Sequence, residues 1–305
     1  MRRVSTFACG HCGASLAFAG VRTETCPYCA SENFVERPPA GDRSDPDFVV
    51  AFGIDAERAR RELRRWAGSR TWFADPALKR ASVLDMRGIY VPAYLYSAAA
   101  HTEFHAQIGE GYTETETYRH TDKDGTTETR TRPVRRTEYR PLAGRHVGYI
   151  TDVLVSASHG LSDRELARTG PFDLRLMRRF EPALVSGWIV EEPSRSADVC
   201  ERASRTEAVE QVGDRLRRFL PGDSYSDLAW HTRVAWESLD PILVPVWVLA
   251  LRYREGAPPL RVVINGQTGT IAGKVPLSAW RVALGAIVLA AALAALAYAI
   301  YTRWS

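Results

Sequence analysis

The sequence predicts an α+β protein with an amino-terminal zinc ribbon, an antiparallel β-rich body and a single carboxy-terminal transmembrane helix. Three observations lead to this class: two early C-x-x-C pairs, β-rich stretches that alternate with two amphipathic helical patterns, and a final run without charge. We expect a zinc ribbon over 1–36, a linker over 37–47, a first α+β unit with a long polar hairpin over 48–193, a second unit over 194–279 and a membrane anchor over 280–305.

The final run extends from Val282 to Tyr301 and holds twenty residues without a charge. A helix of this length reaches roughly 30 Å, at about 1.5 Å per residue, which is the hydrocarbon thickness of a bilayer. Trp280 and Arg281 precede the run and Trp304 follows it, as is typical of membrane interfaces. A buried core helix is the alternative, but a soluble helix of this length usually carries a polar face. We therefore expect a single-pass anchor that contacts membrane lipid.

The compartment is inferred from the cysteines and the amino terminus. The stretch MRRVSTFACG has two arginines but no apolar segment of the kind found in a signal peptide. Clustered thiols indicate a reducing compartment. The flanking charges agree, because Lys274 and Arg281 precede the apolar run and Arg303 alone follows it. We expect a cell-membrane protein whose bulk, residues 1–280, is cytoplasmic.

The cysteines Cys9, Cys12, Cys26 and Cys29 follow the pattern C-x2-C-x13-C-x2-C. Each C-x-x-C pair turns two thiolates toward one ion, and four thiolates complete the closed shell of a structural Zn²⁺ site. Between the pairs, residues 16–18 and 21–25 are expected to form a short hairpin. The predicted role of the ion is to fold this segment, since a closed shell offers no position for catalysis.

Redox chemistry and nucleic-acid binding are other candidate roles for this cysteine segment. A redox C-x-x-C is expected beside a βαβ pattern, which the sequence lacks. His11 lies inside the first pair, but four thiolates suffice, so we expect it to be a bystander. The segment from Met1 to Arg37 carries four arginines and three glutamates, a net charge of +1. A nucleic-acid module normally has a concentrated basic face, so docking to a protein is favoured and nucleic-acid binding is kept as the alternative.

Two helix-plus-strand patterns suggest an internal duplication. Asp55 is expected to cap a helix that runs to about Ala67 and buries Ala56, Ala59, Leu63, Trp66 and Ala67. A second helix over 196–220 is expected to bury Val199, Ala203, Val209, Val212, Leu216 and Phe219. The strands that follow, IYVPAYLY from Ile89 and ILVPVWVL from Ile242, match in residue type at every position. Their prolines predict a sheet edge or a bulge, and coincidence between two β-rich octamers is the alternative to duplication.

A long polar hairpin is expected between these two units. Residues 112–118 alternate Thr and Glu, Asp124-Gly125 marks a tight turn, and residues 126–139 return. The outgoing arm carries Glu110, Glu114 and Glu116, and the returning arm carries Arg130, Arg132, Arg135, Arg136 and Arg140. Opposed arms of opposite sign favour cross-strand pairing, with contact to anionic lipid or an acidic partner as the alternative use of the arginines. A second hairpin is expected over 262–271.

The search for catalytic residues finds no constellation. His101, Glu103 and His105 would share one face of a strand, but the outer two would then be about 13 Å apart, too far for one ion. Cys200 is expected to be structural. Residues 269–274 approach a phosphate loop but are one residue short. We therefore expect no catalytic residues, no organic cofactor and no enzyme activity.

Several segments together carry a resemblance to a known family. They are the cysteine ribbon, residues 72–79, the polar hairpin, residues 152–158, 171–174 and 243–247, and the stretch NGQTG at 265–269. Across almost its whole length the chain resembles bacterial zinc-ribbon membrane proteins, described as TFIIB-type zinc-ribbon proteins and, loosely, as primosomal protein N′ or replication factor Y. The helicase label follows the ribbon, because the ATP-binding loop of that family is missing here.

The resemblance implies a membrane protein without known catalysis, associated with band-7 (SPFH) scaffolds and envelope stress responses. Together with the residues, it favours a non-catalytic adaptor that recruits a protein partner to the cytoplasmic face of the membrane. The alternative is a membrane-tethered nucleic-acid-binding protein.

Overall fold

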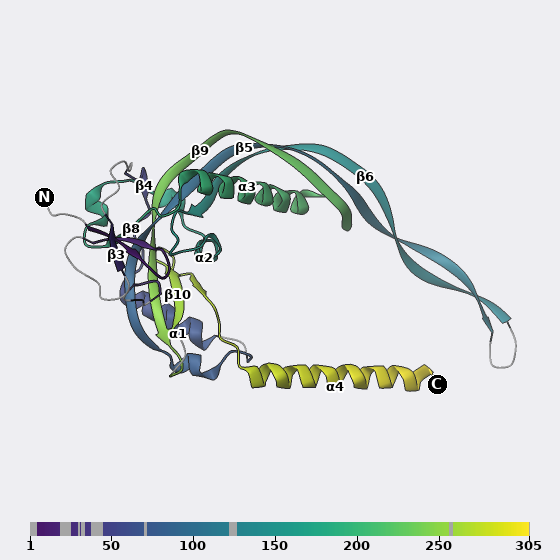
Figure 1. Cartoon of the computed structure of the whole chain (residues 1–305). Helices are drawn as coiled ribbons and strands as arrows, with labels where there is room; N and C mark the ends of the chain where they lie inside the picture. Colours follow the sequence, from purple (N-terminus) through teal and green to yellow (C-terminus); the bar gives the residue numbers. More distant parts are fainter. Residues whose placement is uncertain are drawn as a thin grey trace. The chain divides into compact units, whose positions relative to one another are not determined.

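The computed structural model describes residues 5–18, 26–29, 31, 34–37, 45–69, 72–121, 127–255 and 259–304. Its helices are α1 (Ala56–Gly68), α2 (Asp163–Thr169), α3 (Ala197–Phe219) and α4 (Ala279–Trp304), with short 3-10 helices η1 (Pro76–Arg80), η2 (Leu174–Leu176) and η3 (Pro182–Val185) (Figure 1). Its strands are β1 (Ser5–Cys9), β2 (Ser15–Phe18), β3 (Phe34–Arg37), β4 (Phe48–Val49), β5 (Ser82–Thr121), β6 (Thr127–Ser156), β7 (Arg178–Arg179), β8 (Ile189–Glu192), β9 (Ser224–Arg252), β10 (Leu260–Asn265) and β11 (Ile271–Gly273).

The chain divides into two compact units. Unit 1 takes in Met1–Leu95, Leu154–Cys200 and Asp240–Ser305, and unit 2 takes in Tyr96–Val153 and Glu201–Leu239. This grouping differs from the ranges expected from the sequence, because β5, β6, β9 and α3 each contribute residues to both units. The ribbon strands and the expected membrane anchor both fall in unit 1.

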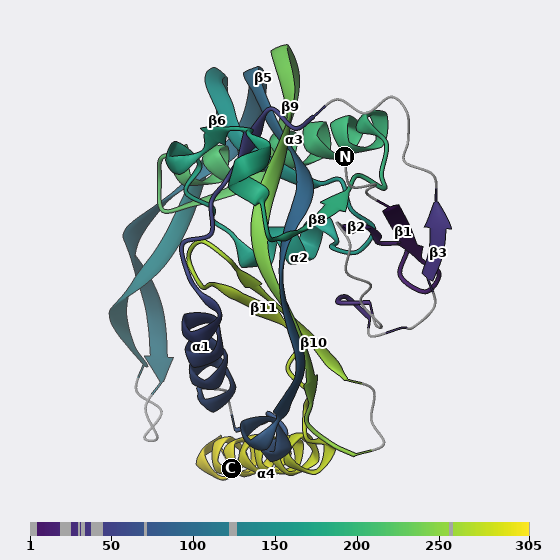
Figure 2. The same ribbon diagram turned by 90° about the vertical axis from the view of Figure 1, so that its left-hand side faces the viewer.

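The sheet has the strand order β11-β10-β9-β5-β8-β2-β1-β3, with β4 beside both β7 and β9 and with β6 beside β5 (Figure 2). Most pairs are antiparallel, as expected, but β4 runs parallel to β9 and β5 runs parallel to β8. The expectation of a wholly antiparallel body is therefore corrected to a mixed sheet. The parallel pairs join strands that are remote in the sequence, so no tight hairpin sets their direction.

The prediction that Pro92 and Pro245 lie at a sheet edge is wrong. Strand β5 lies between β9 and β8, and β9 lies between β10 and β5. Each proline comes just after the end of a parallel ladder. The last residue of β5 that pairs with β8 is Tyr90, and the last residue of β9 that pairs with β4 is Leu243. The two matching octamers lie in neighbouring strands, and their duplication stays a prediction.

Helix α1 agrees with the sequence. Asp55 accepts a hydrogen bond from Arg58 N at 2.7 Å and caps the helix, which buries Ala59, Leu63 and Trp66. Its apolar face packs against the β9–β10 side of the unit 1 core, with Leu249 and Val262 among its neighbours.

Helix α3 has close to the expected bounds, and of its predicted core residues Val212 and Leu216 are buried, as expected. Val199 and Phe219, predicted to be core residues, are 41% and 69% exposed. The buried positions are Cys200, Ser204, Ala208, Val212 and Leu216, one every four residues. Several of these side chains are small, so a pattern based on large apolar residues missed Cys200, Ser204 and Ala208 and wrongly included Val199 and Phe219. Gly213 also faces inward, and a Cβ built on it would lie 2.4 Å from the Trp230 ring of β9.

The polar hairpin is formed by β5 and β6, which are neighbours in the sheet, although its expected turn at 124–125 lies outside the described residues. Cross-strand ion pairs join Arg132 to Glu116 at 2.8 Å and Arg136 to Glu114 at 2.7 Å, as the charge pattern predicts. The side chains of all four are exposed, so each pair contributes at most about 1 kcal/mol. The second predicted hairpin is formed by β10 and β11, with Ile264 opposite Ile271.

Helix α4 is long and apolar enough to cross a membrane over Ala279–Thr302, and none of its apolar window is buried within the structure. The side chains of Ile287, Leu289 and Leu293 in its middle are more than half exposed. The length and composition expected of an anchor are thus present in one uninterrupted helix (Figure 1).

The close approach of α3 to β9 gives a stability prediction. In Gly213→Ala the added methyl group meets the Trp230 ring, and overpacking of this kind costs typically about 1–3 kcal/mol. The matched control is Gly68→Ala at the end of α1, where a Cβ meets nothing within 4 Å and alanine favours the helix. We expect the first substitution to lower the urea midpoint of unfolding and the second to leave or raise it. Equal midpoints for the two variants would contradict the packing described here.

Candidate metal centre

The first pair of cysteines lies in the turn between β1 and β2. Strand β1 pairs with β2 and with β3, so that Phe7 lies opposite both Leu16 and Glu36. At the turn, Gly13 N donates to Cys9 O at 3.0 Å, and Cys9 N donates to Ala14 O at 2.8 Å. Gly13 has a φ of +75°, a left-handed conformation that glycine adopts without strain. The turn therefore brings the Cys9 and Cys12 side chains to one side.

The hairpin expected between the two cysteine pairs falls partly on residues 19–25, which lie outside the described residues. The strand Ser15–Phe18 is present, and its partners are β1 and β8.

The four cysteine sulfurs converge. Their Sγ atoms all lie within 4.8 Å of one another, with Cys9 and Cys29 at 3.5 Å and Cys12 and Cys26 at 3.7 Å. A tetrahedron with Zn–S bonds of about 2.3 Å has sulfurs about 3.8 Å apart, so the group fits such an ion. The four cysteines thus lie close enough to bind one metal ion. His11 is exposed and lies outside this group.

The sulfurs also influence one another's protonation. A hydrogen bond with Cys26 lowers the pKa of Cys12 to about 5, against the effect of burial. The same contact raises the pKa of Cys26, and burial raises the pKa of Cys29 to about 11. Hydrogen bonds between the sulfurs therefore stabilise a thiolate within the group, and an incoming cation would replace the remaining protons.

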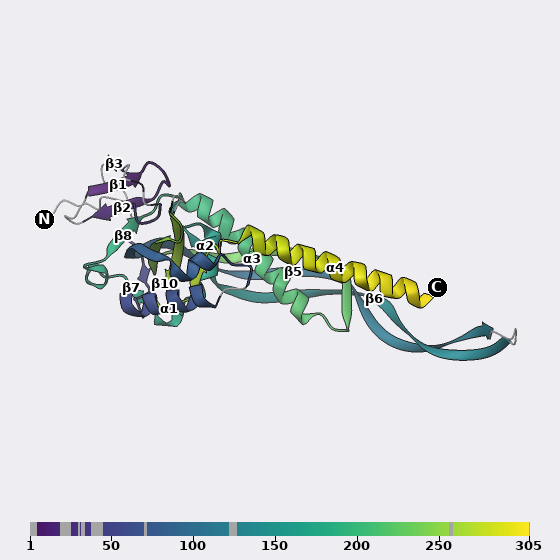
Figure 3. The ribbon, with the colours of Figure 1, turned by 90° about the horizontal axis from the view of Figure 1, so that it is seen from below.

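The cysteine ribbon is joined to the body of unit 1 by strand pairing. Strand β2 runs antiparallel to β8, with Leu16 opposite Glu191 (Figure 3). Tyr28, which lies between Cys26 and Cys29, is buried and donates a hydrogen bond to Glu191 Oε2 at 2.5 Å. The Arg261 guanidinium lies 5.0 Å from the centre of the Tyr28 ring. The second cysteine pair is thus held to the body by a buried side chain of its own.

The loop after β6 completes the surroundings of Glu191. Ser158 Oγ donates to Glu191 Oε1 at 2.5 Å and accepts from Gly160 N at 2.7 Å and from Leu161 N at 3.2 Å. A Cβ on Gly160 would lie 2.9 Å from both Ala14 and Tyr28, so this loop meets the ribbon closely. The loop and both cysteine pairs are therefore packed as one body.

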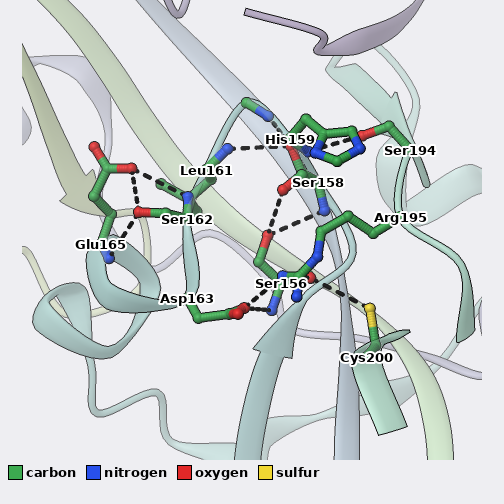
Figure 4. Close-up of polar contacts among 11 residues, drawn as sticks. Ser156, Ser158, His159, Leu161, Ser162, Asp163, Glu165, Ser194, Arg195 and Cys200 are labelled. Carbon is green, nitrogen blue, oxygen red and sulfur yellow. Dashed lines mark hydrogen bonds and ion pairs between the residues drawn. The ribbon is translucent and has the colours of Figure 1, made fainter. Parts of the chain in front are cut away.

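A second polar cluster fixes the start of α3 beside this loop (Figure 4). Arg195 Nη1 donates to Ser156 O at 2.6 Å and to Asp163 Oδ1 at 2.7 Å. Cys200 Sγ donates to the same Ser156 oxygen at 3.5 Å, and burial raises its pKa. A buried thiol that is protonated and hydrogen-bonded in this way is structural, as expected from the sequence.

Burial dominates the electrostatics of Glu191. It raises the pKa of this carboxyl group to about 7, although the hydrogen bonds from Ser158 and Tyr28 act in the opposite direction. Burial and the neighbouring Glu191 also raise the pKa of Tyr28 well above its usual value. The two hydroxyl donors stabilise the charged form of the carboxyl group, whereas its burial away from water favours the neutral form.

The histidine cluster considered above does not form a site. His101, Glu103 and His105 share the exposed face of β5, while Thr102, Phe104 and Ala106 are buried. Glu103 is paired with Arg145 at 3.4 Å. Among the described residues, the group of histidines, cysteines and carboxylates close enough for a metal ion is the four-cysteine cluster.

Sequence reasoning found the four cysteines but missed Tyr28, Ser158 and Glu191. The position of Tyr28 between two cysteines offered one hint that its side chain is placed by the knuckle. Nothing in the sequence indicates that Glu191, which is 163 residues away, meets it.

Comparisons with known proteins give one distant likeness. No family model and no solved structure matches the chain. The chain is 20% identical over 248 residues to the Bacillus subtilis (strain 168) protein named Uncharacterized protein YdjG, a match that covers 78% of this chain and 66% of that protein. The chain thus spans slightly less than two thirds of the length of this relative. An identity of 20% indicates no more than a distant likeness.

The sulfur geometry predicts one metal ion per chain. In Cys12→Ser, a weaker oxygen donor replaces one of the four sulfurs, and we expect the purified protein to lose most of its metal. Cys200→Ser is the matched control, because this cysteine lies outside the cluster. Metal content is measured by inductively coupled plasma mass spectrometry after dialysis. If the two variants retain equal metal, the four-sulfur site is contradicted.

The buried carboxyl group predicts a pH dependence of stability. Because the pKa of Glu191 is about 7 in the folded chain and about 4.5 unfolded, the folded state binds the extra proton between these values. The free energy of unfolding should therefore fall as the pH rises from about 4.5 to about 7, by on the order of 3 kcal/mol from this group.

Glu191→Gln removes this contribution. Between about pH 4.5 and about pH 7, the free energy of unfolding of the variant should rise relative to that of the natural chain. Above about pH 7, the difference between the two proteins should stay constant. Urea unfolding of both proteins with excess Zn²⁺ measures the difference, since protonation of the cysteines then affects both alike. Parallel pH profiles for the two proteins would contradict the buried state of Glu191.

Proposed function

We propose that this chain is a non-catalytic, membrane-anchored adaptor that recruits a partner protein to the cytoplasmic face of the cell membrane. The observation that carries the proposal is α4, because no residue of its apolar window is buried in the described structure. A helix exposed in this way needs an apolar environment, and its length suits a bilayer. It belongs to unit 1, which also holds the cysteine cluster.

We propose that the ion held by Cys9, Cys12, Cys26 and Cys29 is Zn²⁺ and that its role is structural. Four thiolates suit Zn²⁺ in a closed tetrahedral shell, which has no open position for a substrate. The ribbon is hydrogen-bonded to β8, so the ion would stabilise unit 1 as a whole and not the ribbon alone.

Recruitment of a protein is supported by the surface of unit 1. A cavity of about 560 Å³ is lined by apolar residues that include Pro92, Phe180, Pro193 and Ile242, and by polar residues that include Asp45, Glu191, Glu192, Arg195 and Ser196. A concave surface that combines apolar side chains with polar groups is typical of binding sites. The resemblance to zinc-ribbon membrane proteins suggests a band-7 (SPFH) scaffold or an envelope-stress protein as the partner.

The nucleic-acid alternative has less support. The segment from Met1 to Arg37, which includes the ribbon, has a net charge of only +1, and on the polar hairpin Arg132 and Arg136 pair with Glu116 and Glu114. Counterion release from a nucleic acid needs cations that are not already paired.

The adaptor function predicts that the location of the partner follows that of this chain. Leu289→Arg with Leu293→Arg places two charges in the middle of α4, each costing roughly 2.5–3.5 kcal/mol on insertion scales. Both side chains are more than half exposed, so the rest of the structure is unaffected. We expect the variant and its co-purifying partner to move together from the membrane fraction to the soluble fraction.

The control is Leu289→Ile with Leu293→Ile, which keeps the helix apolar. Fractionation of native cells, followed by mass spectrometry of proteins that co-purify with each variant, gives the result. A partner that stays in the membrane fraction without this chain would overturn the adaptor function.

A further inference from the structure

A short aromatic segment is bonded to the chain just before α4. Asp75 N donates to Pro276 O at 2.8 Å, and Ser278 N donates to Phe73 O at 2.9 Å. Ala74 and Leu277 form an antiparallel bridge. These contacts lie within unit 1, and they attach residues 72–75, which we call the aromatic segment, to the base of the apolar helix.

The first turn of α4 reaches back to the same segment. Arg281 Nη1 donates to Trp72 O at 2.8 Å. The Arg281 guanidinium lies 5.4 Å from the centre of the Trp72 ring and 5.3 Å from that of Trp280. The two indole rings meet edge to face, with centres 5.9 Å apart. One cation therefore holds an aromatic side chain from each segment.

These aromatic side chains cluster and yet stay open to solvent. Trp72 and Phe73 are 49% and 43% exposed, and Trp280 is 59% exposed. Leu277, beside them, is 63% exposed. An exposed apolar patch of this kind marks a surface that binds something, and here it continues into the uncovered side chains of α4.

The position of the patch along α4 indicates what covers it. Arg281 immediately precedes the apolar run that begins at Val282, so Trp72 and Trp280 lie where the hydrocarbon region would begin. Tryptophan is enriched at this level of a membrane, where an apolar ring with a polar edge meets the headgroups. Lys79 and Arg80 of η1 are exposed nearby in the sequence, and cations of this kind attract anionic phospholipids. Asp75, the acidic residue of the aromatic segment, is buried and forms an ion pair with Arg254 at 2.6 Å.

We propose that the aromatic segment is a second membrane anchor, with Trp72 and Phe73 inserted among the headgroups of a phospholipid bilayer beside the start of α4. The proposal rests on the membrane-anchoring part of the proposed function. Two attachments from different parts of unit 1 would fix this unit against the bilayer, whereas a helix joined by a free linker would let it turn.

The test uses the full-length chain reconstituted in vesicles of phosphatidylethanolamine and phosphatidylglycerol. Some vesicles carry lipids with bromine on the acyl chain close to the headgroup, which quenches tryptophan at that depth. We expect Trp72→Phe to lose a share of the quenched fluorescence similar to the share lost in Trp280→Phe. The matched control, Trp236→Phe, removes an 83% exposed tryptophan of unit 2 and should leave the quenched amplitude unchanged.

A second variant guards against an indirect effect of the substitution. Trp72→Phe combined with Phe73→Trp returns an indole to the aromatic segment and should restore the lost quenching. Loss in Trp280→Phe without loss in Trp72→Phe would overturn the second anchor and leave α4 as the membrane helix. A chain that does not float with the vesicles would overturn both proposals.

Discussion

The antiparallel pairing of β2 with β8 is the interaction that makes the cysteine ribbon part of unit 1. It places Glu191 between Tyr28 of the second cysteine pair and Ser158 of the body, each at 2.5 Å. A buried carboxyl group costs free energy that two donors only partly offset. The two donors are supplied together only when the ribbon, β8 and the loop after β6 are all in place. The metal centre and this side of the sheet therefore depend on each other.

Two of the segments that carry the family resemblance, residues 171–174 and 265–269, meet in unit 1. The Asn265 side chain donates to Thr169 O at 3.0 Å and to Pro171 O at 3.4 Å, which ties the β10–β11 turn to the segment after α2. Gln267 Oε1 accepts from Asp173 N at 2.7 Å, and its Nε2 donates to Asp173 O at 3.1 Å. A Cβ on Gly266 would lie 2.5 Å from the Phe52 ring. Close packing and buried hydrogen bonds explain why these motif residues are present. A protein that shares them is therefore expected to have a similarly packed body.

The two units are stabilised in different ways. In unit 1, both β5 and β9 contain long buried stretches, from Ile89 to Ala93 and from Ile242 to Leu249. In unit 2, much of β6 is exposed, and its ion pairs with β5 are screened by solvent and salt. The apolar contact there comes from α3, where Gly213 lets the helix approach Trp230. Unit 2 therefore has less buried apolar surface along its strands to hold it together.

The sequence by itself determined the features that depend on neighbouring residues: the Asp55 cap and buried face of α1, the opposed charges of the polar hairpin, the cysteine spacing and the apolar length of α4. Periodicity and spacing act over a few residues, so one sequence is enough to read them. The tertiary structure alone decided the parallel pairs β4–β9 and β5–β8, the position of Pro92 and Pro245 in interior strands, the small residues that α3 buries and the contact of Tyr28 with Glu191. Each of these depends on which distant segments meet. A small residue is buried where a helix comes close, and a carboxyl group is held where two donors converge.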